Sequence, residues 1–422
     1  MSSTSRPGLA GGAGGPAPGA KTGEDAPEGT RFGLVLMLWA AGLGAAAQYG
    51  KVALVYDMLP ELYPGAGAVL GWAVSLVGVV GIALGVAAGV LVAAIGLRRS
   101  MLVGLAGGAA LSACQALAPP LWAFLALRVI EGAFHLAVVV AAPTLISQFS
   151  APRHRPVTLT LWGTFFGVAF AVIAAAGVPL AEARGVPALF AAHAVWMAAF
   201  AVLLAPLLPA DGPAAGGPLP RPGDLLVQSA RIYRSPWIGA PAAGWLSYTF
   251  AYVALLTLIG PAIPEAARTA TLAAMPLVSI AASLTLGVAL MRRVPAVTVM
   301  RIGFAASALC TLALLAAPGH PALCLLVAAA LGLVQGSGFA AVPELNAAAS
   351  DRALANGGLA QAGNLGNTLG VPVLAACMAA FGFAGLALPL AAALALGALW
   401  QGRLARLRAG SEAGPAPRPD RR

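Results

Sequence analysis

The chain has 422 residues, of which 60% are hydrophobic and 9% are charged. Soluble domains carry about 25% charged residues, so this composition excludes a soluble fold of the same length. The surplus apolar surface has to face lipid. The formal net charge of +10 does not indicate nucleic-acid binding, because the arginines lie in loops with no folded domain to present them.

Residues 1–31 are rich in Gly, Pro, Ala and Ser and lack the apolar core of a secretory signal. We expect a disordered cytoplasmic tail there. The apolar stretches that follow are long enough for membrane helices of about 20 residues, and they lack the alternating polarity of β-barrel strands. The first six predicted helices are Phe32–Tyr56, Val69–Gly96, Met101–Leu117, Leu121–Phe149, Val157–Ala181 and Val186–Leu208.

A longer polar stretch, residues 209–236, is interpreted as a cytoplasmic linker, and residues 406–422 as a basic cytoplasmic tail. The expected fold is an all-α integral membrane protein with twelve transmembrane helices in two pseudo-symmetric six-helix halves, residues 32–208 and 237–405. The last six predicted helices are Trp237–Ile263, Thr269–Met291, Pro295–Ala317, Pro321–Leu345, Leu354–Phe381 and Phe383–Leu404.

The loops alternate in charge along the chain. By the positive-inside rule, the arginine-rich loops lie in the cytoplasm. Both termini are therefore predicted on the cytoplasmic side of the cell (inner or plasma) membrane. The arginine-rich set contains Arg98, Arg99, Arg153, Arg155, Arg221, Arg231, Arg234, Arg292, Arg293, Arg352, Arg403, Arg406 and Arg408. The opposite set contains Arg184 and Arg268 beside Asp57, Glu61, Glu182 and Glu265.

A shift of 200 residues superimposes landmarks of the two predicted halves. Gly132 meets Gly332, and the Ala-x-Pro-x-Leu sequence that ends at Leu145 meets the one that ends at Leu345. A long-range repeat of this kind indicates two structural units in the same orientation.

One local motif follows the second predicted helix. The sequence reads Gly89-Val-Leu-Val-Ala-Ala-Ile-Gly96-Leu-Arg98-Arg99. It is similar to the Gly-x-Leu-x-Asp-Arg-x-Gly-Arg-Arg gating loop of the major facilitator superfamily, but two alanines stand where Asp and Arg are usual. The resemblance to this family covers residues 32 to about 405 and implies its two-half fold and alternating-access transport.

A second motif lies in the fourth predicted helix, where Arg128-Val-Ile-Glu131-Gly132 resembles the Arg-x-x-Gln-Gly pattern of the same family. In proton-coupled members the matching arginine lies in the central cavity and is implicated in proton movement. The spacing puts Arg128, Glu131 and His135 on one helix face. Charged groups inside a membrane mark solute or proton paths, so these three are the proton-coupling candidates. A purely structural ion pair is the alternative interpretation.

Candidate substrate contacts come from polar and aromatic side chains inside other apolar stretches. Amides suit a polar organic solute because they both donate and accept hydrogen bonds, although they could equally tie helices together. The lysine, which lies near a helix end, could instead extend to the membrane–water interface. The aromatic side chains could be packed in the hydrophobic core. The candidates are Gln48, Tyr49, Lys51, Trp245, Tyr248, Tyr252, Gln335, Gln361, Asn364, Asn367 and Thr368.

No nucleotide-binding loop of the G-x-x-x-x-G-K-[S/T] type is present, so an ion gradient is the expected energy source. We expect a monomeric proton-coupled exporter of a small organic molecule, such as a drug-like compound or a siderophore. Proton-coupled uptake of an organic anion or another small metabolite is the alternative. An enzyme is not expected, because Gly336-Ser337-Gly338 is better explained by helix packing. Neither a cofactor nor a metal is expected.

Overall fold

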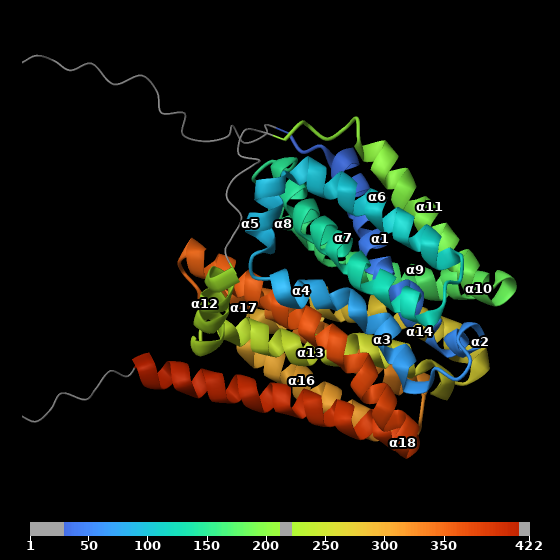
Figure 1. Cartoon of the computed structure of the whole chain (residues 1–422). Coiled ribbons are helices and arrows are strands. Elements are labelled where there is room, and N and C mark those ends of the chain that lie inside the picture. Colours follow the sequence, from blue (N-terminus) through green and yellow to red (C-terminus); the bar gives the residue numbers. More distant parts are fainter. Residues whose placement is uncertain (1–28, 212–221, 413–422) are drawn as a thin grey trace, which may run out of the picture.

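The computed structural model describes residues 29–211 and 222–412, and all regular elements of these residues are helical (Figure 1). Ten of the described helices are long and apolar enough to cross a membrane. The number is eleven when α5 and α6, which meet at an angle of 101°, count as one span. The predicted all-α membrane fold is confirmed at this level.

The first part of the chain folds into helices of very unequal length. The stretch Gly71–Gly89 contains five glycines, which weaken a helix, and the predicted helix Val69–Gly96 is accordingly broken into several pieces. The α-helices are α1 (Phe32–Ala53), α2 (Leu59–Leu62), α3 (Leu70–Ser75), α4 (Val79–Leu84), α5 (Ala88–Ile95), α6 (Leu97–Ala116), α7 (Leu121–Gln148), α8 (Arg155–Gly163), α9 (Phe165–Val172), α10 (Val178–Arg184) and α11 (Val186–Leu204). Three short 3₁₀-helices are η1 (Tyr56–Met58), η2 (Gly67–Val69) and η3 (Leu76–Gly78), and η4 (Ile173–Gly177) is a π-helix.

The second part of the chain contains longer helices. Its α-helices are α12 (Pro222–Arg234), α13 (Gly239–Leu258), α14 (Glu265–Ala282), α15 (Val288–Met291), α16 (Ala296–Ala313), α17 (Pro321–Leu345) and α18 (Ala349–Glu412). In addition, η5 (Gly260–Ala262) is a 3₁₀-helix and η6 (Ser283–Gly287) is a π-helix.

Helix α18 is two helices joined without a loop. Its 64 residues are interrupted at Gly382, where φ is 61° and ψ is −148°. Only glycine adopts this backbone conformation readily, so the chain reverses at this residue. The break agrees with the predicted boundary between Leu354–Phe381 and Phe383–Leu404.

Three predicted boundaries need correction or fall partly outside the described residues. The expected linker 209–236 contains the helix α12, whose apolar residues are spaced as on one helix face. The expected tail 406–422 begins inside α18, because Arg406–Ala409 consists of good helix formers. Residues 1–28, 212–221 and 413–422, including Arg221, lie outside the described residues.

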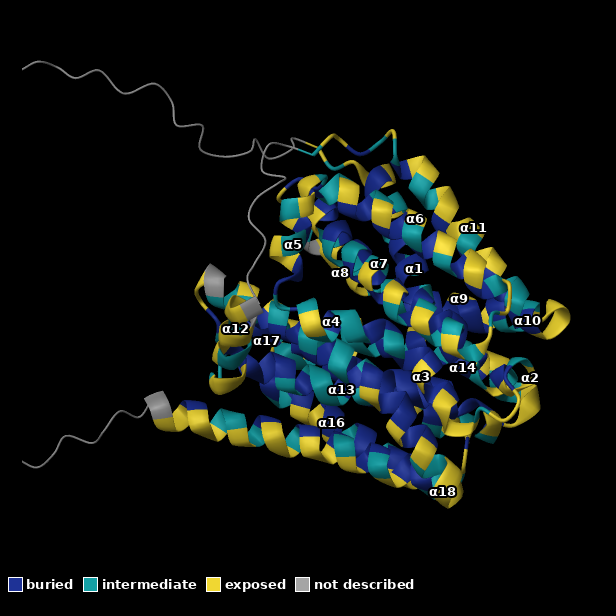
Figure 2. Ribbon diagram, viewed as in Figure 1, coloured by how far each residue is buried: buried dark blue, intermediate teal, exposed yellow. Residues whose placement is uncertain are grey.

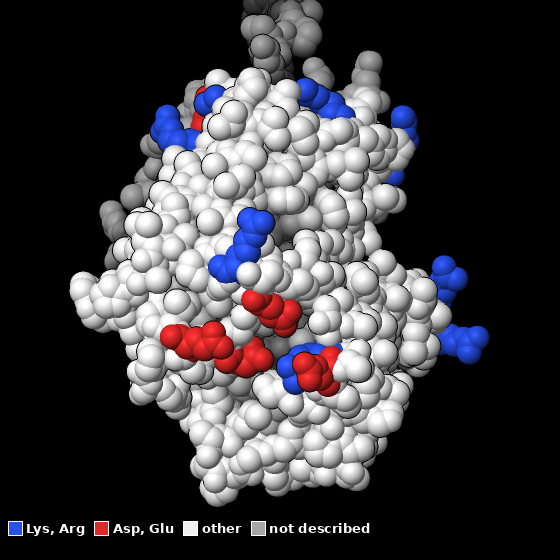
Figure 3. Space-filling view, turned by 90° about the vertical axis from the view of Figure 1, so that its right-hand side faces the viewer, with Lys and Arg blue, Asp and Glu red and all other residues white. Residues whose placement is uncertain are grey.

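The helices run mostly along one direction of the molecule (Figure 1). One end holds α5, α8, α12 and the C-terminal end of α18, which are the elements next to the arginine-rich loops. The other end holds α2 and α10. Figure 3 views this second end, where a few acidic side chains gather on an otherwise largely uncharged surface.

Buried residues lie between the helices, and exposed ones lie on the outer faces of peripheral helices such as α11 and α18 (Figure 2). Many of the exposed side chains are large and apolar. Leu117 is 81% exposed, Trp122 is 75% exposed and Val202 is 73% exposed. An outer surface of this kind suits lipid, because contact with water would be unfavourable.

Two glycines allow close helix approach at matching places. A Cβ atom added to Gly132 of α7 would collide with the backbone carbonyl of Val77 in η3. A Cβ atom added to Gly332 of α17 would collide with the carbonyl of Ser279 in α14. Because the obstacle is backbone in both cases, no side-chain rotation relieves the clash.

Gly132→Ala and Gly332→Ala are each expected to destabilise the protein by about 2 kcal/mol, the range for overpacking a tight contact. Gly163→Ala serves as the control, because nothing lies within 4 Å of the added Cβ atom. Thermal unfolding of the purified protein, followed by tryptophan fluorescence, measures the effect. Equal melting temperatures for all three variants would contradict the close approach.

Candidate functional site

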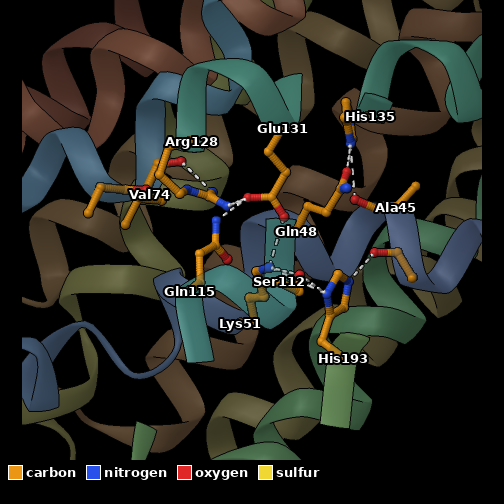
Figure 4. Close-up of polar contacts among 12 residues, drawn as sticks. Ala45, Gln48, Lys51, Val74, Ser112, Gln115, Arg128, Glu131, His135 and His193 are labelled. Carbon is orange, nitrogen blue, oxygen red and sulfur yellow. Dashed lines mark hydrogen bonds and ion pairs between the residues drawn. The ribbon is translucent and has the colours of Figure 1, made fainter. Parts of the chain in front are cut away.

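Six polar side chains form a sealed network among α1, α6, α7 and α11, called here the buried polar cluster (Figure 4). Five of the six side chains have no exposed surface, and the sixth, His193, is 6% exposed. The members of the cluster are Lys51, Ser112, Gln115, Arg128, Glu131 and His193.

Glu131 is the centre of the cluster. Its Oε1 atom accepts a hydrogen bond from Lys51 Nζ at 2.8 Å. Its Oε2 atom accepts from Gln115 Nε2 at 2.8 Å and also forms an ion pair with Arg128 Nη1. Both carboxylate oxygens are therefore satisfied, which a buried carboxylate requires.

A second branch of the cluster runs from Lys51 toward α11. Lys51 Nζ donates to Ser112 Oγ at 2.5 Å, and Ser112 Oγ lies 2.6 Å from His193 Nδ1. His193 Nε2 lies 2.8 Å from the carbonyl of Gly44, so this nitrogen must carry a proton. The Ser112 hydroxyl can then donate to His193 Nδ1, and the imidazole is neutral in this arrangement.

Arg128 connects the cluster to a neighbouring broken helix. Its Nε atom donates to the Ala73 carbonyl at 2.6 Å, and its Nη2 atom donates to the Val74 carbonyl at 3.4 Å. Both carbonyls belong to α3, which ends at Ser75 and therefore leaves its last carbonyls free of helix partners.

The cluster has more positive than negative charge. Lys51 and Arg128 face a single carboxylate, that of Glu131, so the cluster carries a net charge of one positive unit when His193 is neutral. Burying charges is costly unless each is paired and hydrogen bonded. Removing the carboxylate should therefore disturb the fold more than removing one cation.

Glu131→Gln leaves two buried cations without a counter-charge, and we expect it to lower stability by about 3–5 kcal/mol. Lys51→Met leaves the balanced Arg128–Glu131 pair and should cost clearly less. Thermal unfolding of the purified variants checks this order. A larger loss for Lys51→Met than for Glu131→Gln would show that charge balance does not govern the cluster.

The remaining candidates on α1 and α7 lie beside the cluster. His135 Nδ1 donates to the Ala45 carbonyl at 3.0 Å and approaches Gln48 Oε1 at 3.1 Å. The ring of Tyr49 meets the ring of His135 edge to face, with centroids 5.3 Å apart. Within the described residues, Gln48 Nε2 is buried without a hydrogen-bond partner. His135 thus shares a helix face with Arg128 and Glu131 but bonds to a different part of α1.

The polar face of α18 lies against α3 and α4. Gln361 Nε2 donates to the Ile82 carbonyl at 2.9 Å, and Thr368 Oγ1 donates to the Ser75 carbonyl at 3.2 Å. Ser75 Oγ donates in turn to the Asn367 carbonyl at 3.2 Å. These bonds join the first and second parts of the chain.

The same contact includes glycines that bring the backbones together. A Cβ atom added to Gly81 would collide with the Asn364 side chain, and one added to Gly71 would lie 2.9 Å from Pro372 Cα. The hydroxyl of Tyr49 donates to Asn364 Oδ1 at 3.4 Å. In this conformation the amides therefore tie helices together, which is one of the two roles expected of them.

The aromatic candidates form a stack along α13. Ring centroids are 4.9 Å apart for Trp245 and Tyr248 and 5.3 Å apart for Tyr248 and Tyr252. Both tyrosines are buried in the core between helices. Gln335 lies partly exposed on α17, and within residues 29–211 and 222–412 no hydrogen bond to it is found.

The residues that resemble the gating loop of the family lie on α5 and at the sharp bend between α5 and α6. Gly96 has a φ of 103°, which favours glycine, and Gly89 lies exposed on α5. The carboxylate of Asp211 accepts hydrogen bonds from the backbone nitrogens of Arg98 at 2.8 Å and Arg99 at 3.0 Å. Asp211 therefore caps the N-terminus of α6 from a residue far along the chain.

Asp211→Ala should cost about 1 kcal/mol through the lost cap. Asp211→Asn keeps an oxygen that can accept a hydrogen bond and should cost less. Melting temperatures of the two variants and of the unchanged protein test the cap. Identical values for Asp211→Ala and the unchanged protein would exclude a stabilising role for this contact.

Sequence reasoning missed several parts of the site. Ser112 and Gln115 are three residues apart in an otherwise apolar stretch, and that spacing was the available signal. His193 was not among the candidates, because a single histidine in an apolar helix is a weak signal. Asp211 has no such signal, because only the tertiary fold brings it to α6.

The fold and the site together define an integral membrane protein with an ionisable network sealed inside its helices. The family model of the Major Facilitator Superfamily matches residues 34–265, which is more than half of the chain. The chain therefore belongs to the Major Facilitator Superfamily and is a transporter of that type. A comparison with curated proteins finds no match.

Proposed function

We propose that the protein exports a small organic molecule, such as a drug-like compound or a siderophore, in exchange for protons. The single observation that carries the proposal is the Glu131 carboxylate, which is fully buried between Lys51 and Arg128. An ionisable group inside a membrane is costly, and its usual reason is the passage of a charge or a solute.

The proposal includes twelve transmembrane helices in two six-helix halves, with both termini in the cytoplasm. Twelve spans result when α5 and α6 count once and α18 counts as two helices divided at Gly382. The repeat supports the two halves, because Gly132 and Gly332 make the same kind of backbone approach 200 residues apart. The arginine-rich end supports the orientation.

Two contacts between the proposed halves have to open and close during alternating access. In one, α3 and α4 pack on α18; in the other, α9 and η4 pack on α14. At the second contact, a Cβ atom added to Gly167 would lie 2.8 Å from Ile280 Cδ1. Opening one end of these contacts would admit water and solute between the halves, where the amides of α18 become available as substrate contacts.

In this cycle the buried polar cluster is the proposed coupling group. It is enclosed by α1, α6, α7 and α11, whereas the α18 amides lie on the opposite side of α3 and α4. Proton exchange at Glu131 would then weaken or restore its ion pair with Arg128, and so change the hydrogen bonds from Arg128 to the carbonyls of α3. His135 is the second candidate for a proton carrier, because imidazole ionises near neutral pH in water.

One observation favours the alternative of proton-coupled uptake of an organic anion. The cluster has two cations for one carboxylate, so an anionic solute near α1 would find a favourable potential. The direction of proton flow distinguishes the two functions.

Proteoliposomes with a pH dye inside separate export from uptake. When added substrate enters the vesicle, an exchanger moves protons out and the lumen becomes more alkaline. A symporter carries protons in together with the substrate, and the lumen becomes more acidic. We expect the alkaline response for a transported compound in a panel of organic cations, neutral drugs and organic anions. An acidic response restricted to anions would favour uptake.

Glu131→Gln is expected to abolish the pH response while exchange of labelled substrate across the membrane persists. Glu61→Gln, a change at an exposed carboxylate outside the cluster, serves as the control. The double variant Lys51→Met/Glu131→Gln keeps the net charge of the cluster and is the substitute where the single variant does not fold. An undiminished pH response in both variants would refute proton coupling through Glu131.

A further inference from the structure

Two cavities near the arginine-rich end share one construction. Each contains two arginines together with small or apolar side chains. The first, with a volume of about 400 Å³, is lined by Arg98, Arg99, Leu102, Val103, Ala210 and Asp211. The second, with a volume of about 390 Å³, is lined by Arg301, Leu399, Gly402, Ala405, Arg406 and Ala409.

The two cavities differ in their negative charge. In the first, Asp211 supplies a carboxylate, and the Arg98 side chain donates to the carbonyls of Leu208 and Ala205. Among the described residues, the second has no acidic residue in its lining. In the part of the chain that the structure describes, neither Arg301 nor Arg406 forms a hydrogen bond or an ion pair. Within those described residues, the two neighbouring guanidiniums of the second cavity therefore have no carboxylate as a partner.

The second cavity lies where the helices leave the membrane. Arg301 is the sixth residue of α16, about 8 Å along the helix axis from its first residue. Arg406 lies in the last two turns of α18. Leu399 in the lining is 68% exposed, and the neighbouring Trp400 is 53% exposed. Exposed tryptophan beside arginine is typical of the headgroup level of a bilayer.

The small residues shape the floor of the cavity. Gly402, Ala405 and Ala409 follow one another at spacings of three and four, so they share one face of α18. Their short side chains leave room between α16 and α18 that a larger residue would fill. A Cβ atom added to Gly402 would lie 3.3 Å from Arg301 Nη2, so the guanidinium rests directly over this face.

We propose that the second cavity binds the headgroup of an anionic phospholipid. The guanidiniums of Arg301 and Arg406 hold the phosphate, since planar guanidinium groups bind phosphate oxygens well. Leu399 contacts the acyl chain. Basic pockets between membrane helices at the interface suit this class of lipid.

The first cavity illustrates why the second one accepts an external anion. There, Asp211 already occupies the space beside the paired arginines and bonds to the backbone of α6. The pairs α6–α11 and α16–α18 correspond in the proposed two-half arrangement, so one half contains its own carboxylate and the other takes the anion from lipid. The lipid site itself does not depend on that correspondence.

The full-length protein, purified and delipidated in detergent, is titrated with short-chain phosphatidylglycerol and, separately, with phosphatidylcholine. Thermal stabilisation reports binding. We expect phosphatidylglycerol to bind about 30-fold more weakly to Arg301→Gln/Arg406→Gln, which corresponds to about 1 kcal/mol per arginine. Phosphatidylcholine should act equally on both proteins. The control Arg292→Gln/Arg293→Gln removes the same charge from the loop before α16 and should keep the affinity of the unchanged protein.

Three outcomes would overturn the proposal. One is an equal loss in the control, which would show a diffuse charge effect. Another is full stabilisation by inorganic phosphate alone, which would indicate a free-anion site. The third comes from brominated phosphatidylglycerol, which quenches the fluorescence of nearby tryptophans. We expect less quenching in Trp400→Phe than in the unchanged protein, and equal quenching would place the lipid elsewhere. This last measurement uses folded protein with both arginines intact, so it tests the site even where the arginine variants do not fold.

Discussion

The Glu131 carboxylate, held between Lys51 and Arg128, is the interaction on which the rest of the structure depends. It brings α1, α6 and α7 together in the middle of an apolar bundle, where an unpaired charge would be severely destabilising. Gln115 and Ser112 complete the hydrogen bonding, so no neighbouring charge is left without a polar partner. The first part of the chain is therefore organised around a charge network as much as around its apolar core.

Composition and loop charge were sufficient to predict an all-helical membrane protein, because lipid imposes strong constraints on both. The turn at Gly382 was also placed correctly, since two apolar stretches meet there with no room for a loop. Breaks within a span, such as the one that ends α3 at Ser75, were not predicted. A run of glycines weakens a helix at many positions, and only packing against α7 and α18 selects the positions that break.

For the candidate site, helical spacing correctly grouped Arg128 with Glu131, because partners on one helix follow from periodicity alone. Lys51 was left open between the interface and the interior, and the structure turns it inward to the carboxylate. Its contacts with Ser112 and His193 come from other helices, and helix spacing carries no information about which faces meet. The amides of α18 were recognised as a polar face, but their partners are backbone carbonyls, which no side-chain pattern reveals.

Helix α3 has contacts on two sides: Arg128 holds its carbonyls on one, and Thr368 bonds to its last residue on the other. A single short helix thus belongs to both the charge network and the contact between distant parts of the chain. Coupling of this kind is reciprocal by thermodynamic necessity. If proton binding at the cluster favours separation of α3 from α18, a solute that separates the two helices must tighten proton binding by the same factor.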